Sequence, residues 1–363
     1  MNDNSVQSPG RTRGLEIEAL FHRHVERDPT IRNAYLLVHS DTLGIHMNLA
    51  AGPGEGQGVS PQQPVFMASV GKLFTSVILA TLHEQGVLSF HDPIERYLPP
   101  EMMKNLHVWK GKDYSSNIQI RHLLNQTSGL PDNFFPLLKK VMADHTISMT
   151  PQDAVEWTKG NLTPRAAPGK RAHYTDTNYH LLGLIVEEVC GEPFHIVLKK
   201  VIFDPVGMKG AYMLHRSEPA APSSCPEAGF YIGETRLNNL KALAGIDYAG
   251  GGVVAPMEDL LLFMKALVGL HLVSRDTLAI MKDDKANLYP GFDYGYGIWQ
   301  VRPVPLLIPP QYDSWGVLGA TGAYMFYHPA LETYLIGSFN HTSWQKKCVR
   351  FMFKVMRLLH GLK

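Results

Sequence analysis

Ser69-Val-Gly-Lys-Leu-Phe-Thr-Ser-Val-Ile-Leu-Ala-Thr-Leu82 is the most informative segment of this 363-residue chain. From Ser69 onward, apolar residues recur at helical spacing, and small or apolar residues fill most of the other faces. A helix that is apolar nearly all round is a buried one. Gly86 is suited to end such a helix. The segment therefore predicts a buried helix that begins at Ser69.

Ser69 and Lys72 lie three residues apart, so they share one face of that helix. The lysine amine can then approach the serine hydroxyl. The helix N-terminus favours a developing alkoxide, and burial is expected to lower the pKa of Lys72 towards that of a useful base. A lone S-x-x-K also arises by chance in many chains. On this pair alone, a catalytic dyad and a satisfied polar pair in the core both remain open.

The surrounding chain is organised with strands at both ends and helices in the middle. Strand-like runs occupy residues 34–39 and 45–50 near the start, and residues 294–300, 323–328 and 334–340 near the end. Helical patterns occupy residues 14–27, 177–190, 256–267 and 344–359. This order predicts an α/β (α+β) fold, in which both termini build one antiparallel sheet flanked by helices.

Two lobes follow from this organisation. Residues 1–90 and 250–363 are expected to form the sheet lobe, and residues 91–249 a mostly helical lobe inserted into it, with the site in the cleft between them. The basic last helix has an apolar stripe, which suits either packing on the sheet or a membrane surface. We favour packing on the sheet.

Composition excludes several classes of function. Lys and Arg number 34 against 33 Asp and Glu, so the chain lacks the electrostatic footprint of a nucleic-acid-binding protein. Three cysteines make neither a disulfide framework nor a zinc site. The histidines include no H-E-x-x-H, so no metal is expected. Without an export signal or a membrane-spanning stretch, a cytoplasmic location is expected. The oligomeric state is left open.

Four further segments have a family resemblance when taken together with Ser69-Val-Gly-Lys72. They are Ile120-Arg-His-Leu-Leu-Asn-Gln-Thr-Ser-Gly-Leu-Pro131, Tyr174-Thr-Asp176, Ala249-Gly-Gly-Gly-Val-Val-Ala-Pro256 and Tyr294-Gly-Tyr-Gly-Ile-Trp299. In this order they resemble the serine β-lactamases and penicillin-binding-protein-like hydrolases, and most of all the class C β-lactamase-like esterases and D-alanyl carboxypeptidases. The resemblance implies a β-lactamase/transpeptidase-like fold and a serine hydrolase that needs no metal or organic cofactor.

The resemblance also implies roles for individual residues. Ser69 would be the nucleophile and Lys72 its activating partner. Tyr174 would relay the proton, as a phenolate-like tyrosine stabilised by a nearby ammonium; the alternative for Tyr174 is a packing role. Asp176 stands where the family commonly has an amide, and is expected to hold Lys72 in place. A carboxylate donates no hydrogen bond at neutral pH, which puts binding of an amide substrate in doubt.

The third motif departs from the family pattern. Where relatives have Lys-Thr-Gly or His-x-Gly, this chain has Val317, Leu318 and Gly319. The cation that would grip a substrate carboxylate is missing, and Val317 is expected to offer the substrate only apolar surface. Gly319 allows close approach of the backbone. The amides of Ala320 and Ser69 are expected to form the oxyanion hole.

These observations predict a covalent acyl-enzyme on Ser69. The predicted reaction is hydrolysis of a carboxylic ester with a neutral or hydrophobic acyl group, the partner being a small-molecule acyl substrate. An acyltransferase or thioesterase of the same fold is the next alternative, followed by a β-lactamase or D-alanyl peptidase. A catalytically silent binding relative is the alternative from a different class.

Overall fold

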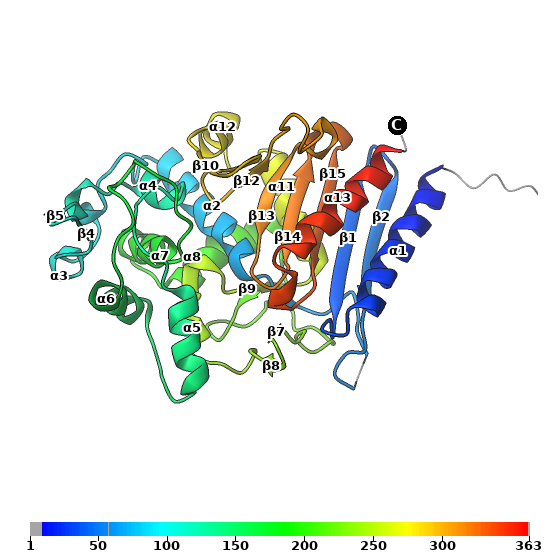
Figure 1. Cartoon of the computed structure of the whole chain (residues 1–363), viewed down its shortest axis with the longest axis horizontal. Coiled ribbons are helices and arrows are strands. Elements are labelled where there is room, and N and C mark those ends of the chain that lie inside the picture. Colours follow the sequence, from blue (N-terminus) through cyan, green and yellow to red (C-terminus); the bar gives the residue numbers. More distant parts are fainter. Residues whose placement is uncertain (1–8, 57, 362–363) are drawn as a thin grey trace, which may run out of the picture.

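An eight-stranded antiparallel sheet forms the centre of the molecule (Figure 1). The computed structural model describes residues 9–56 and 58–361. In space, the strands follow the order β10-β11-β12-β13-β14-β15-β1-β2. Their bounds are β1 (Ala34–Ser40), β2 (Ile45–Ala51), β10 (Ala286–Tyr289), β11 (Phe292–Tyr294), β12 (Trp299–Val301), β13 (Ser314–Leu318), β14 (Tyr324–His328) and β15 (Thr333–Ser338). Strands from the two ends of the chain therefore complete one sheet, as predicted.

The contact between the two ends is the pairing of β1 with β15. Leu36 lies opposite Gly337, and Val38 opposite Leu335. Every residue of β1 is buried, whereas its hairpin partner β2 lies at the edge of the sheet and is partly exposed. Because β1 is paired on both sides and helices cover both faces of the sheet, its sequence reads as a continuous apolar run and not as an alternating one.

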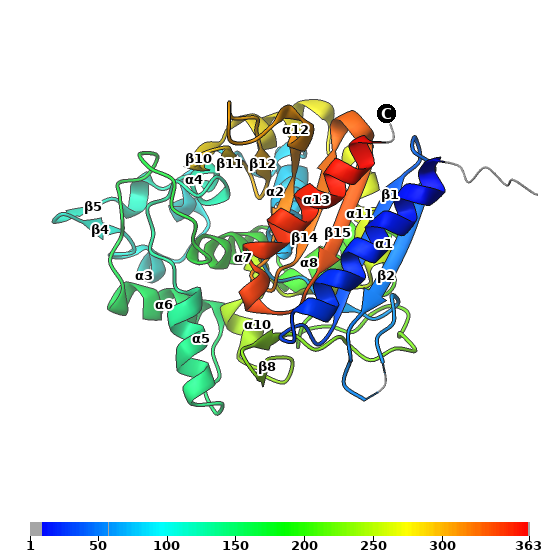
Figure 2. The same ribbon diagram turned by 45° about the vertical axis from the view of Figure 1, so that its right-hand side comes forward.

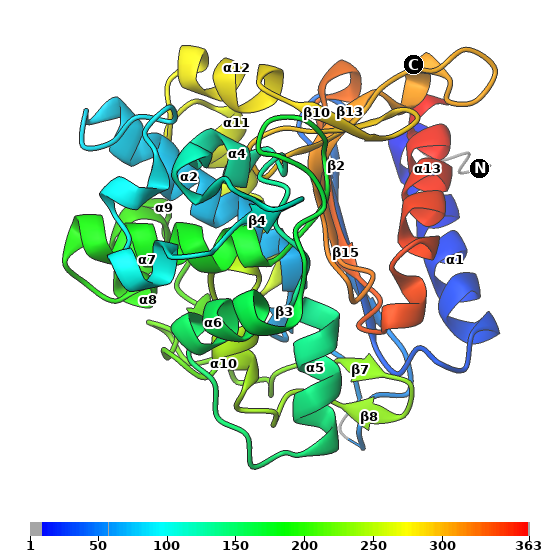
Figure 3. The ribbon, with the colours of Figure 1, turned by 60° about the vertical axis from the view of Figure 1, so that its left-hand side comes forward.

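Helices lie on both faces of this sheet. Helices α1 (Pro9–Arg27) and α13 (Lys347–His360) cover one face, and α2 (Gly71–Glu84) and α11 (Met257–Val268) lie on the other (Figure 3). The apolar stripe of α13 is buried against the core. Packing on the sheet, the alternative that we favoured, therefore accounts for that stripe.

The segment between β2 and β10 contains most of the remaining helices. They are α3 (Pro100–Met103), α4 (Ile120–Leu124), α5 (Phe134–Ala143), α6 (Pro151–Asn161), α7 (Thr177–Cys190), α8 (Phe194–Leu198), α9 (Asp204–Val206), α10 (Leu243–Ile246) and α12 (Arg275–Asp283). A small sheet joins β3 (Val65–Phe66), β9 (Val253–Ala255) and β6 (Tyr212–Met213). Two short hairpins pair β4 (Val108–Trp109) with β5 (Lys112–Asp113), and β7 (Tyr231–Ile232) with β8 (Thr235–Arg236).

Local sequence signals explain several helix ends. Thr150 caps α6 by accepting a hydrogen bond from the amide of Asp153, whose carboxylate accepts one from the amide of Thr150. Helix α7 ends at Gly191, which adopts the left-handed conformation with φ of 66°. Among residues 9–56 and 58–361, none of the helices has the length and apolar character needed to cross a lipid bilayer.

Two predictions from the sequence were wrong in detail. Helix α2 begins at Gly71 and not at Ser69, because Ala68–Val70 form a separate 3₁₀ turn that Ala68 enters with φ of 48°. The run from Tyr294 to Gln300 is not one strand. The chain reverses between β11 and β12 at Gly297, whose φ is 70°.

Candidate active site

Ser69 is distinguished by its accessibility. Every other residue from Gln63 to Ala80 is buried, whereas Ser69 is partly exposed. The preceding Ala68 has a positive φ, a conformation that costs a non-glycine residue about 1–3 kcal/mol and is concentrated at functional sites. The backbone turn before α2 therefore presents a single hydroxyl to solvent from within the core.

Lys72 lies directly beneath this hydroxyl. Its side chain is fully buried, and its Nζ donates hydrogen bonds to Ser69 Oγ over 2.9 Å and to the carbonyl oxygen of Gly250 over 2.8 Å. The same nitrogen forms an ion pair with Asp176 Oδ1. Gly71 makes this arrangement possible, because a Cβ at that position would lie 1.9 Å from the carbonyl oxygen of Gly251. All three donor positions of the ammonium are thus occupied.

The expectation that burial lowers the pKa of Lys72 was wrong. Burial does act in that direction, but Asp176, through its charge and its hydrogen bond, outweighs it together with the neighbouring Tyr174 and Asp247, and the pKa lies above that of an ordinary lysine. For this pKa, we weighed burial alone from the sequence and left out the charge of Asp176, which we had expected beside Lys72, and that of Asp247. Lys72 is therefore a charged ammonium at neutral pH, which donates to Ser69 and does not accept its proton.

Tyr174 is the second group in contact with Ser69. Its ring centroid lies 5.2 Å from Lys72 Nζ. Burial raises the pKa of the Tyr174 phenol, and the Lys72 ammonium and a hydrogen bond with Ser69 oppose that rise without cancelling it. The resting side chain is therefore a neutral phenol and not the phenolate-like group expected from the sequence. The residue nevertheless adjoins both the serine and the ammonium that could stabilise a phenolate.

A hydrogen-bond network fixes the segment that carries Tyr174. The amide of His173 donates to the carbonyl oxygen of Gln126 over 2.8 Å, and the amide of Thr175 donates to Gln126 Oε1 over 2.9 Å. Asn178 Nδ2 donates to the same Oε1 over 2.8 Å. The turn that follows α4 thus holds the Tyr174 segment on both sides of the tyrosine.

Two acids of the site were not singled out from the sequence. Asp132 accepts a hydrogen bond from the amide of Asp176 over 2.9 Å, and burial together with the charge of Asp176 raises its pKa to about 6. Asp247 is fully buried, and burial with the charge of Asp176 raises its pKa to about 7 against the opposing effect of Lys72. Both residues border the segments quoted for the resemblance, but their convergence on Lys72 is a property of the fold.

The end of β13 lies close to the turn that carries Ser69. A Cβ on Gly319 would lie 2.6 Å from the carbonyl oxygen of Met67 and 3.3 Å from the Cβ of Ala68, so glycine is required for this approach. Leu318 and Ala320 are partly exposed. In the part of the chain that the structure describes, the amide of Ala320 donates no hydrogen bond, which leaves it available to an oxyanion.

The side chain of Val317 lies in the core and not on the surface of the site. Its side chain is fully buried in the core, on the opposite side of β13 from the partly exposed Leu318. The expectation that Val317 offers apolar surface to a substrate was therefore wrong. Leu318 is the accessible apolar side chain at this end of the strand.

Aromatic rings border Tyr174. Trp299 stacks on Tyr174 with centroids 5.9 Å apart, and the exposed Tyr289 stacks on Trp299 at 6.4 Å. Tyr294 packs edge-on against both Tyr174 and Trp299. No group of three metal-ligating side chains occurs among residues 9–56 and 58–361. The site therefore combines a hydroxyl, an ammonium and a phenol, and aromatic and aliphatic side chains surround these groups.

Comparisons with known proteins identify the family of this chain. The sequence profile of the Beta-lactamase family matches residues 23–354, so the chain belongs to this family. Penicillin-binding protein 4* of Bacillus subtilis is 32% identical over 251 residues, which are 66% of this chain and 52% of that protein. The chain thus spans about half the length of the curated relatives it matches.

Solved structures share the fold at lower sequence identity. D-amino acid amidase from Ochrobactrum anthropi SV3, complexed with D-phenylalanine, superposes with a TM-score of 0.79 and 21% identity, covering 97% of this chain and 100% of that one. EstCE1, described as a hydrolase with promiscuous acyltransferase activity, gives a TM-score of 0.76 and 18% identity, covering 97% and 99%. The family members include serine hydrolases that act as amidases, esterases and peptidases.

Proposed function

We propose that this protein is a serine esterase that forms a covalent acyl-enzyme on Ser69. The observation that carries the proposal is the single accessible hydroxyl of a buried segment, hydrogen-bonded to an ammonium and adjoining a phenol. Nucleophile, charge and proton carrier lie in direct contact, which is the geometry that nucleophilic catalysis by serine needs.

In the proposed reaction, Ser69 Oγ attacks the acyl carbonyl carbon and its proton passes to Tyr174 in the deprotonated form. The Lys72 ammonium stabilises that phenolate, and the amides of Ser69 and Ala320 bind the oxyanion. Tyr174 then gives the proton to the leaving alkoxide as the C–O bond of the ester breaks. A water molecule repeats the sequence on the acyl-enzyme and releases the acid.

Neutral, hydrophobic acyl groups are the proposed substrates. The residue that replaces the family's cation, Val317, is apolar and buried, so it supplies no partner for a substrate carboxylate. The accessible side chains are Leu318 and, beyond Tyr174, the stacked rings of Trp299 and Tyr289. An acyltransferase, which passes the acyl group to an acceptor other than water, or a thioesterase of the same fold is the second candidate. The promiscuous acyltransferase activity stated for EstCE1 supports it.

A fluorophosphonate probe tests the proposal directly. We expect one probe per chain by mass spectrometry, located on Ser69, and none in Ser69→Ala. The matched control is Ser76→Ala in the same helix, where the hydroxyl is buried and lies 3.3 Å from Tyr179 Oη. That variant should be labelled like the unchanged protein. Absence of labelling in the unchanged protein would instead support a catalytically silent relative.

A substrate panel separates the candidate reactions. We expect turnover of short p-nitrophenyl esters and little turnover of nitrocefin, which carries a carboxylate. Adding an alcohol acceptor should divert part of the acyl-enzyme to a new ester if transfer occurs. Efficient hydrolysis of nitrocefin would contradict the assignment to neutral acyl groups.

A further inference from the structure

The outer face of α1 and α13 carries a positive charge that the site at Ser69 does not use. Figures 1 and 2 both show these helices side by side in front of the sheet, and Figure 3 shows them as a layer on the opposite side of the sheet from the helical lobe. The chain has 34 basic and 33 acidic residues. Helix α13 contains four of the basic and none of the acidic residues, so the rest of the chain has 30 against 33.

The cations of α13 form a stripe. Arg350, Lys354 and Arg357 are spaced four and three residues apart, which places them on one face of the helix, and all three are exposed. The apolar face of the helix is buried against the sheet. Among residues 9–56 and 58–361, these three side chains form no ion pair with a carboxylate.

Helix α1 adds cations to the same face. Arg23 and Arg27 are exposed and one turn apart. The pKa of His24 is lowered, mainly by burial and further by the positive charges of Lys354, Arg27 and Arg23. Lys354 Nζ lies 3.0 Å from His24 Nε2. The positive charges of Lys354 on α13 and of Arg23 and Arg27 on α1 therefore lie close enough to act on the same histidine.

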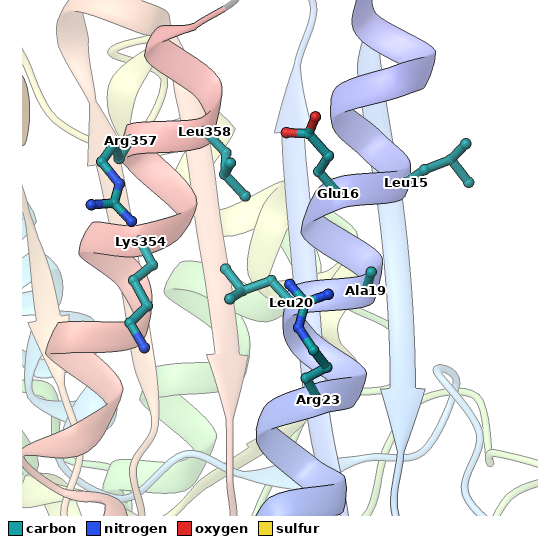
Figure 4. A pocket seen from close by; sticks show the side chains of 8 residues that line it. All are labelled: Leu15, Glu16, Ala19, Leu20, Arg23, Lys354, Arg357 and Leu358. Atoms are coloured by element: carbon teal, nitrogen blue, oxygen red, sulfur yellow. The ribbon is translucent and has the colours of Figure 1, made fainter.

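An apolar groove lies between these cations. A hollow of about 500 Å³ separates the two helices (Figure 4). Leu20 and Leu358 extend into it from opposite sides, and the exposed Leu15 lies on α1 near its rim. Arg23, Lys354 and Arg357 line the groove, and Glu16 is the one acidic side chain among the described residues that line it. Cations around the exposed Leu15 and the partly exposed Leu20 and Leu358 form a surface complementary to anionic headgroups above acyl chains.

We propose that the face formed by α1 and α13 docks on the surface of an anionic lipid bilayer. Arg23, Arg27, Arg350, Lys354 and Arg357 would contact the headgroups, and Leu15 and Leu358 the interfacial region. Because the sheet separates this face from Ser69, attachment leaves the nucleophile free. The proposal is independent of the chemistry at Ser69.

Vesicle co-sedimentation tests the docking. The full chain should bind vesicles of phosphatidylcholine with 30% phosphatidylglycerol, bind pure phosphatidylcholine at least tenfold more weakly, and dissociate at 0.5 M salt. Each cation near an anionic surface contributes about a fivefold change in partitioning. The triple variant Arg350→Gln, Lys354→Gln, Arg357→Gln should therefore bind roughly 100-fold more weakly.

A matched control variant distinguishes the effect of the charge on this face from the effect of the total charge of the protein. Replacing the exposed Lys104, Lys139 and Lys140 of the helical segment by Gln removes the same charge elsewhere, and should reduce binding less than threefold. Both triple variants should keep the circular dichroism spectrum of the unchanged protein. Failure to bind the anionic vesicles, or equal losses in the two variants, would overturn the proposal. A dimer in sedimentation velocity that the α13 variant abolishes would overturn it in favour of a second copy of this chain.

Discussion

Asp247→Asn should change the pH dependence of stability in a direction that the structure specifies. The Asp247 carboxyl is fully buried, and its Oδ2 accepts a hydrogen bond from the amide of Gly252 over 2.9 Å. Burial, the first cause, and the charge of Asp176 raise its pKa to about 7 from 3.8, although Lys72 acts in the opposite direction. Asparagine has the same shape and keeps an oxygen acceptor for Gly252, but does not titrate.

The direction of this pH dependence follows from the number of protons that the folded and unfolded states bind. Between about pH 4 and pH 7 the folded protein retains a proton on Asp247 that the unfolded chain has released, so the free energy of unfolding falls as the pH rises through this range. Each unit of pKa difference corresponds to about 1.4 kcal/mol, which gives about 4 kcal/mol over the full window and about 3 kcal/mol of it between pH 5 and pH 7. Above about pH 7 this contribution is constant.

Urea denaturation at pH 5 and pH 8 measures the difference. Relative to the unchanged protein, Asp247→Asn should be about 3 kcal/mol more stable at pH 8 than it is at pH 5. The exposed Asp283→Asn serves as the control, and its relative stability should be the same at both pH values. If Asp247→Asn shifts the free energy of unfolding equally at pH 5 and pH 8, the assignment of a raised pKa to this carboxyl is refuted.

The remaining predictions concern the reaction and the end of β13. Lys72→Ala and Tyr174→Phe should each lower kcat by about 10²–10⁴-fold, and the double variant little more, since they act as one unit; losses that multiply would contradict this. Because the pKa of Tyr174 is raised, kcat/KM for a neutral ester should still be rising at pH 9, and a plateau below pH 8 would exclude the phenol as the base. Gly319→Ala brings a Cβ to 2.6 Å from the carbonyl oxygen of Met67, so ester turnover should fall at least tenfold while the protein stays folded by circular dichroism. Val317→His buries an unpaired imidazole, so it should lower the free energy of unfolding by about 1–3 kcal/mol, and a gain in turnover of carboxylate-bearing substrates would refute the buried placement.

The sequence alone was sufficient to predict those elements whose local residue pattern agrees with the fold. The first two strands, the buried helix after Ser69 and the helix over 177–190 each depend on residues close together in the chain, and the structure has all of them. The closing of one sheet by both termini also followed from the order of the strand-like and helical segments. The 3₁₀ turn that carries Ser69 did not, because it depends on the backbone conformation of Ala68.

The charge state of the site could not be predicted from the same information. Whether Lys72 is a base or an ammonium depends on acids at positions 176 and 247, which two separate segments bring together. Burial of a lysine alone would have lowered its pKa, and only the folded arrangement shows that the acids outweigh burial. The face of β13 on which Val317 lies is likewise a matter of strand register, which one residue of slippage reverses.

The pairing of β1 with β15 has a consequence for how the chain is made. About 290 residues separate the two strands, and at about 5–20 residues per second a ribosome needs about 15–60 s to synthesise them. During that interval β1 and β2 have emerged, but the apolar edge of β1 lacks the strand that will cover it. An uncovered edge of this kind is a template for pairing with other chains. We therefore expect the nascent chain to depend on a holding chaperone until β15 has been made, and the yield of folded protein to fall when translation slows within the helical segment.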